Sequence, residues 1–226
     1  MKSKILIATV LMSSAYFVQS CNSSTESSTT HEKDSSMQHM EKKDTMHSGK
    51  MGMDNGMMSS MDGMHSMMKD MKMTGDFDYD FASMMMAHHQ GAIDMATMEI
   101  SKGSNAETKA IAENIIKTQQ AEIEQFKNIL KDYKMPEMKK EGGEKHNELG
   151  ETMEKMDAKM KSISMTGNAD KDFAMMMIPH HESAVTMAED QLSHGKNLAL
   201  KKMAQKIIED QSKEIIQFQT WLSKNK

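Results

Sequence analysis

Two adjacent histidine pairs, each preceded by a methionine pair, carry the most evident chemistry in this sequence. The side chains are Met84, Met85, His88 and His89 in one segment and Met176, Met177, His180 and His181 in another. On a helix, residues four apart share a face, so each Met and the His four positions later can approach the same ion. Thioether and imidazole ligands together suit Cu(I). We therefore interpret these segments as metal-binding, with Cu(I) preferred and Cu(II) or silver as alternatives.

Helix packing offers an alternative role for several of these methionines. A methionine stripe at helical spacing usually belongs to a hydrophobic core. Met95 and Met187 extend the stripe beyond the His pairs, and both remain candidate ligands beside their packing role. His65 lies off the apolar stripe of its own segment and is a further candidate. Histidines that only pack are the alternative for the four His residues.

Two glutamines occupy unusual places in the sequence. Gln119 and Gln211 each stand on an otherwise apolar helical stripe downstream of a His pair. A buried amide needs a hydrogen-bond partner. Each could orient a ligating histidine through its second ring nitrogen. Bonding to the backbone of another helix is an equally good explanation.

Both His segments belong to a longer internal repeat. At an offset of 92 residues, positions 71–130 align without a gap to positions 163–222, and 27 of the 60 pairs are identical. Upstream, Met61, Met64 and Met68 align with Met153, Met156 and Met160. The chain thus contains two copies of one unit. We assign residues 57–134 to the first repeat, 135–148 to a linker and 149–226 to the second repeat.

Each repeat is expected to be helical. Its first part carries one helical stripe of apolar residues spaced four and three apart: Met57, Met61, Met64, Met68 and Met71. A Thr-Gly turn follows, and Asp78 and Asp170 are expected to cap the helices that carry the His pairs. Few prolines and many Lys, Glu, Met and Ala residues also favour helix. The sequence predicts an all-α protein, an antiparallel helical bundle built from two tandem repeats.

The segment before the first repeat has a different composition. Residues 22–36 are almost entirely polar, and Met and His then alternate with Gly, Ser and Lys without a helical period. Such a tract cannot build a core. We interpret residues 21–56 as a flexible tether with a metal-capturing tail, in which His39 and His47 are candidate ligands.

The N-terminus is typical of an export signal. Lys2 and Lys4 precede a short apolar stretch that ends near the single cysteine, Cys21. This arrangement predicts a lipoprotein signal at 1–20 and a lipid anchor on Cys21, so that the protein faces the periplasm or the cell surface. An ordinary signal peptide with an incidental Cys is the alternative. Thiols oxidise outside the cytoplasm, which leaves thioether sulfur as the soft ligand.

Charge and composition exclude one large class of function. The formal net charge is -5, and the 28 basic residues are all Lys. Nucleic-acid binders normally carry a basic face with arginines. We therefore expect metal ions and a membrane as partners and no nucleic acid, while the oligomeric state stays open.

The repeated motif resembles a known family. Phe-Ala-x-Met-Met-x-x-His-His-x-x-Ala-(Ile/Val)-x-Met-Ala, at 81–96 and 173–188, together with Gln-x-x-Glu-Ile-x-x-Phe from Gln119 and Gln211, is similar to domain-of-unknown-function family 305. That resemblance implies a ferritin-like helical bundle. It also implies copper binding of the CopM type by the paired Met and His residues. One difference between the copies is Pro179 in place of Ala87, which predicts a kink in the second His helix.

Three functions remain distinguishable from the sequence. A copper-sequestering or copper-transferring protein without enzymatic activity is the leading hypothesis. A ferritin-like metal-dependent oxidase is the second, although di-iron bundles use Glu-x-x-His motifs that these helices lack. A structural or interaction protein with packing histidines is the third.

Overall fold

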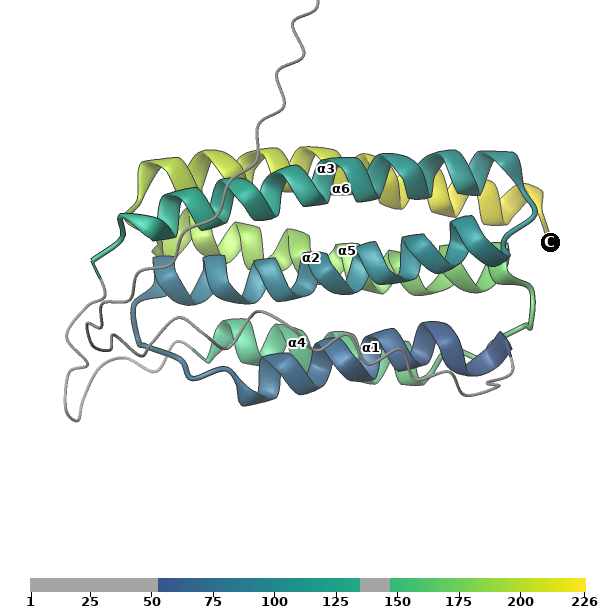
Figure 1. The fold of residues 1–226 in the computed structure, drawn as a ribbon, viewed down its shortest axis with the longest axis horizontal. Coiled ribbons are helices and arrows are strands. Elements are labelled where there is room, and N and C mark those ends of the chain that lie inside the picture. Colours follow the sequence, from purple (N-terminus) through teal and green to yellow (C-terminus); the bar gives the residue numbers. More distant parts are fainter. Residues whose placement is uncertain (1–52, 135–146) are drawn as a thin grey trace, which may run out of the picture. The chain divides into compact units, whose positions relative to one another are not determined.

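Six helices and no strands make up the residues that the computed structural model describes, 53–134 and 147–226 (Figure 1). The helices are α1 (Met53–Asp70), α2 (Phe77–Lys102), α3 (Ala106–Lys131), α4 (Glu148–Lys161), α5 (Ala169–His194) and α6 (Leu198–Lys224). Helix α1 begins slightly earlier than the sequence predicted for the first repeat. None of these helices combines the length and apolarity that crossing a membrane requires.

The two repeats predicted from the sequence have matching helices. The bounds of α5 are those of α2 shifted by 92 residues, and α6 starts at the same shift from α3. Pro179 lies inside α5, yet the helix runs unbroken from Ala169 to His194. Pro179 therefore does not interrupt the helix.

Helices α2 and α5 form the centre of the bundle (Figure 1). Helix α2 packs against α1, α3 and α5, and α5 packs against α4, α6 and α2. Figure 1 shows α3 with α6 on one side of this central pair and α1 with α4 on the other. Three-residue connections join α2 to α3 and α5 to α6, which makes each pair antiparallel. Side chains on α2 and α5 can thus be enclosed on all sides.

Methionines fill much of the core, as the helical stripes predicted. Met57, Met61 and Met64 of α1 are buried, and so are their α4 counterparts Leu149, Met153 and Met156. Apolar burial of this kind supplies most of the stability of an amphipathic helix. The unbranched Met side chain adapts to irregular spaces between helices.

The helix caps differ from the sequence prediction. Asp76 and Asn168, not Asp78 and Asp170, accept hydrogen bonds from the first turns of α2 and α5. Asp78 instead accepts hydrogen bonds from the backbone nitrogens of Lys196 and Asn197, at 2.9 and 3.0 Å. The prediction was wrong because Asp78 lies two residues inside its helix and faces the other repeat.

Asp170 makes the reciprocal connection to the first repeat. Its carboxylate accepts from the backbone nitrogens of Ser104 and Asn105, both at 2.9 Å, and from the Thr108 hydroxyl at 3.0 Å. Each repeat therefore holds the short connection between the two long helices of the other. We call these two sets of contacts the cross-caps of Asp78 and Asp170.

Candidate metal centre

His88 of α2 and His180 of α5 meet at the middle of the bundle. Their ring centroids are 3.7 Å apart, and both side chains are fully buried. The sequence placed one His pair in each repeat without indicating that the pairs would touch. The fold brings these two rings together because α2 and α5 are the central helices and pack on one another.

The two rings differ in their hydrogen bonds. His88 Nε2 lies 2.8 Å from Ser183 Oγ. That hydroxyl is also 2.6 Å from the His180 carbonyl oxygen and 3.0 Å from the Met156 sulfur. Neither ring nitrogen of His180 has a hydrogen-bond partner. The asymmetry has a local cause, since Gly91 occupies in α2 the position that Ser183 occupies in α5.

The second histidine of each pair faces away from this contact. His89 Nε2 is 3.0 Å from Glu122 Oε2, and His181 Nε2 is 2.7 Å from Glu214 Oε2. Both carboxylates are mostly buried on the outer helices α3 and α6. Sequence reasoning assigned no role to either glutamate. One feature of the sequence points to them: in both repeats a glutamate stands three positions after the glutamine on the apolar stripe.

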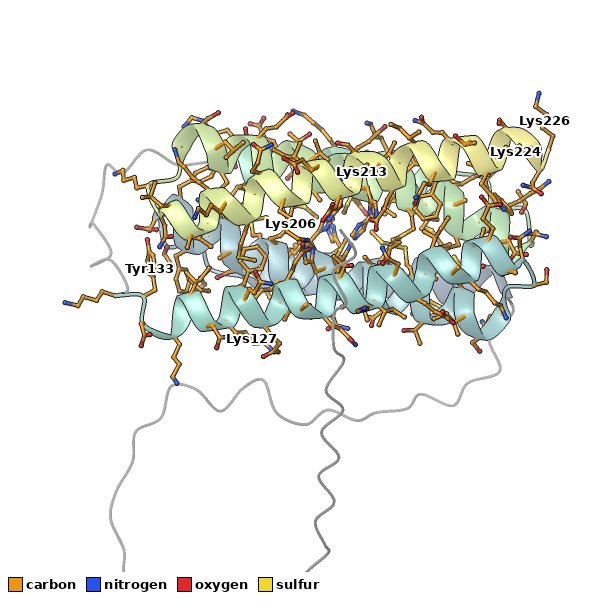
Figure 2. The ribbon with its side chains drawn as sticks, turned by 90° about the horizontal axis from the view of Figure 1, so that it is seen from above. Lys127, Tyr133, Lys206, Lys213, Lys224 and Lys226 are labelled. Atoms are coloured by element: carbon orange, nitrogen blue, oxygen red, sulfur yellow. The ribbon has the colours of Figure 1, made fainter. Side chains whose placement is uncertain are left out.

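The environments of these two glutamates are not identical. Lys206 of α6 donates to Glu122 at 2.9 Å, whereas the equivalent residue of the first repeat, Asn114, donates to Glu214 at 3.4 Å. Figure 2 shows Lys206 at the seam between α6 and α3. Burial acts to raise the pKa of Glu122, but hydrogen bonds and charge from His89 and Lys206 outweigh it and lower that pKa. Glu122 is therefore a carboxylate at neutral pH.

In His88, His89 and His181, the hydrogen bond at Nε2 leaves the other ring nitrogen free. A carboxylate only accepts, so the protons of His89 and His181 lie on Nε2. The Ser183 hydroxyl has one proton and a close carbonyl acceptor in His180, so His88 also donates from Nε2. The Nδ1 atoms of all four histidines are buried without a hydrogen-bond partner. Unpartnered buried nitrogens of this kind are unusual in native proteins.

Electrostatics keep the central rings neutral. Burial is the main cause that lowers the pKa of both His88 and His180 well below 6.5, and the neighbouring histidines lower it further. A weak contact with the backbone of the facing histidine acts in the opposite direction. Neutral imidazole is the form that binds metal ions.

The methionines singled out from the sequence all lie in the core of the same two helices. The set is Met84, Met85, Met95, Met176, Met177 and Met187, and each is buried. His65 is elsewhere: its side chain is 41% exposed on α1, and its Nδ1 lies 3.9 Å from Asp157 of α4. Cys21, His39 and His47 lie outside the described residues.

The arrangement restricts what kind of ion could bind. Across 53–134 and 147–226, no three His, Cys, Asp or Glu side chains are grouped as a metal site would require. The same two helices also carry buried methionines, and thioether sulfur is a ligand that suits soft cations. Gln119 and Gln211 make neither of the two hydrogen bonds considered from the sequence, to a histidine or to the backbone of another helix. Their amides are buried without partners, and the glutamates orient the histidines instead.

The fold and this buried centre define a helical bundle of two repeats with paired histidines at its core. The chain belongs to the DUF305 family, described as a domain of unknown function. The family model matches it twice, over residues 16–130 and 78–222; the first match includes one His pair and the second includes both. None of the curated proteins is similar enough to count as a relative.

Solved structures show the same fold. The silver-bound form of CopM is 31% identical, with a TM-score of 0.50 over 65% of this chain and 96% of CopM. The Cu(II)-bound form of CopM is 32% identical, with a TM-score of 0.50 over 65% of this chain and 97% of CopM. A DUF305 protein of Streptomyces coelicolor is 21% identical, with a TM-score of 0.53 over 67% of this chain and 95% of that chain.

Proposed function

We propose that this protein is an exported lipoprotein that binds copper(I) or silver(I), and that it sequesters the ion or hands it on in copper homeostasis. The observation that carries the proposal is the set of four buried Nδ1 atoms without hydrogen-bond partners, on two helices that also bury Met84, Met85, Met176 and Met177. CopM, which is similar over most of its length, has been solved with silver and with Cu(II) bound.

The hydrogen bonds match what metal-ligating histidines usually need. Such a histidine donates its second N–H to a carboxylate or another acceptor, which fixes the ring and its tautomer. Glu122 and Glu214 serve His89 and His181 in this way, and Ser183 serves His88. A histidine that only packs has no need for an unpartnered nitrogen in a buried core.

The chemistry of the ligands favours Cu(I) over Cu(II). Thioethers are poor ligands for hard cations, and the centre offers no grouping of nitrogen and oxygen ligands alone. Within the proposal, His88 and His180 form the shared core of the site. Met84 and Met176, one helical turn before them, supply the sulfur.

Competition titration with a copper(I) chelator tests this function. The proteins to compare are the wild type, His88→Ala/His89→Ala, His180→Ala/His181→Ala and the fourfold variant. Each pair should remove tight binding while circular dichroism shows unchanged helicity. A fourfold variant with wild-type affinity and stoichiometry would mean that the histidines only pack, and that any copper binding belongs to the N-terminal Met-rich segment.

A further inference from the structure

A surface cleft approaches the buried centre on one side. A cleft of about 200 Å³ lies between α4 and α5, and Met156, Pro179 and Ser183 are among the residues that line it. Ser183 Oγ is 2.8 Å from His88 Nε2 and 3.0 Å from the Met156 sulfur. One hydroxyl group therefore separates the cleft from a ring of the histidine centre.

An ion pair spans the same cleft. Lys159 of α4 donates to Glu182 of α5 at 2.9 Å, and both side chains are largely exposed. Exposed pairs of this kind contribute little to stability, so they break and re-form easily. Lys155 is also on the rim, and its Nζ lies 3.7 Å from Glu151 Oε2. The Glu151 carboxylate offsets part of the Lys155 charge. The rim can thus open without disturbing the helices beneath it.

The first repeat is built differently at the equivalent place. Gly91 stands where Ser183 stands, and a β-carbon added to Gly91 would lie 2.7 Å from the Met64 sulfur. Met64 therefore occupies the space that the serine side chain fills in the second repeat. The ion pair is also missing there, because Met67 and Gln90 hold the positions of Lys159 and Glu182.

We propose that the cleft between α4 and α5 is the channel through which a soft monovalent cation reaches the histidine centre, and that the Met156 thioether is its first ligand on the way. The proposal rests on the proposed function. It assigns Met156 a transient role, so the sulfur changes the rate of uptake and not the final affinity. Met64, its counterpart in the first repeat, has no such role.

The first test needs no metal. Dilute hydrogen peroxide is applied to the metal-free full-length mature chain, and sulfoxide formation at Met156 and Met64 is followed by peptide mass spectrometry. Both sulfurs are buried in the static structure, so a difference reports opening of the cleft. Met156 should oxidise at least several-fold faster than Met64. Equal rates overturn the channel whether or not the protein binds metal.

The second test measures uptake. A coloured copper(I)–chelator complex is mixed with apo-protein in a stopped-flow instrument, and the kinetic phase that His88→Ala/His180→Ala lacks is followed. Met156→Leu should slow this phase about tenfold and leave its amplitude unchanged, while Met64→Leu, the matched control, leaves both unchanged. Lys159→Met, which removes the ion pair, should accelerate it.

The outcomes separate the two proposals. An unchanged rate in Met156→Leu, or equal slowing by Met64→Leu, overturns the channel and leaves the proposed function standing. If no kinetic phase of the wild-type protein depends on His88 and His180, the proposed function is overturned. The proposed path for the ion through the cleft then fails as well, even if Met156 oxidises faster than Met64.

Discussion

The carboxyl group of Glu99 lies beside that of Asp170, where the first repeat meets the second, and the two groups ionise in very different pH ranges. Burial is the main cause that raises the pKa of Glu99 from 4.5 to about 7, and the nearby Asp170 raises it further. A hydrogen bond from Thr108 acts in the opposite direction. Burial also acts to raise the pKa of Asp170, but hydrogen bonds from Asn105, Glu99 and Ser104 lower it to about 2. In the second repeat, Gln191 takes the place of Glu99 and donates to Asp78 at 2.6 Å.

Replacing Glu99 by Gln should stabilise the protein at neutral pH. The folded pKa of Glu99 lies above the unfolded value, so its contribution is complete below about pH 4.5 and is lost as the pH rises to about 7. Glu99→Gln should raise the free energy of unfolding by ~1–3 kcal/mol at pH 8 and change it little at pH 4.5. Urea titrations at both pH values measure this difference.

The reciprocal substitution serves as the control. Gln191→Glu places a carboxyl group beside Asp78 and should destabilise the protein more at pH 8 than at pH 4.5. A Glu99→Gln effect of equal size at both pH values would contradict the ionisation argument.

Removing one cross-cap should destabilise the whole bundle. Asp170→Ala leaves the backbone nitrogens of Ser104 and Asn105 without their side-chain acceptor, while the Thr108 hydroxyl keeps its bond to Glu99. We expect a loss of about 2–4 kcal/mol in the free energy of unfolding, measured by guanidinium denaturation. Asp94→Ala removes only a contact on the exposed side of α2 and should cost less than about 0.5 kcal/mol. Similar losses in the two variants would show that the cross-cap contributes little.

The buried glutamates should control copper affinity through histidine orientation. Glu122→Ala removes the acceptor for His89 Nε2, and Glu214→Ala removes the one for His181. Each should weaken copper(I) binding by about 10–100-fold, measured by chelator competition. Glu122→Gln and Glu214→Gln keep an oxygen acceptor and should stay within a few-fold of the wild type. A Gln variant as weak as the Ala variant would indicate a requirement for charge.

His88 and His180 should behave as one unit in binding. Their rings are in contact, so His88→Ala and His180→Ala should each remove most of the tight copper(I) binding. The double variant should be little worse than either single variant, a non-additivity that a double-mutant cycle detects. Additive losses of equal size would indicate two independent sites.

The N-terminal anchor can be tested separately from the bundle. Cys21→Ser should move the protein from the membrane fraction to a soluble fraction, because the acylated sulfur is lost. Immunoblots of the fractions measure this. The anchor hypothesis fails if the variant fractionates with membranes as the wild type does.

Periodicity was sufficient to predict the helices and their repetition. The stripe from Met57 to Met71 and the offset of 92 residues predicted the all-helical class and the two units, which the fold confirms. Partnerships across the bundle could not be predicted this way. Whether His88 contacts His180 depends on which faces of α2 and α5 pack together. The spacing of residues along one helix does not encode that packing.

The sequence pattern also did not predict the hydrogen bonds of charged side chains to residues far along the chain. The sequence predicts Asp78 as a cap of its own helix, whereas its partners lie more than a hundred residues away in the chain. Glu122 stands 33 residues after His89, and Glu214 stands 33 after His181. A search for polar residues repeated at matching separations in both copies would have identified this pairing.

Gly91 and Ser183 illustrate what covalent fusion of two repeats allows. A bundle assembled from two identical chains must carry the same residue at both equivalent positions, so its two halves would open or close alike. A single chain with two copies is free of that symmetry. Mutation can adapt one copy to exchange ions with the solvent and leave the other copy closed, without changing the helix packing that both copies share.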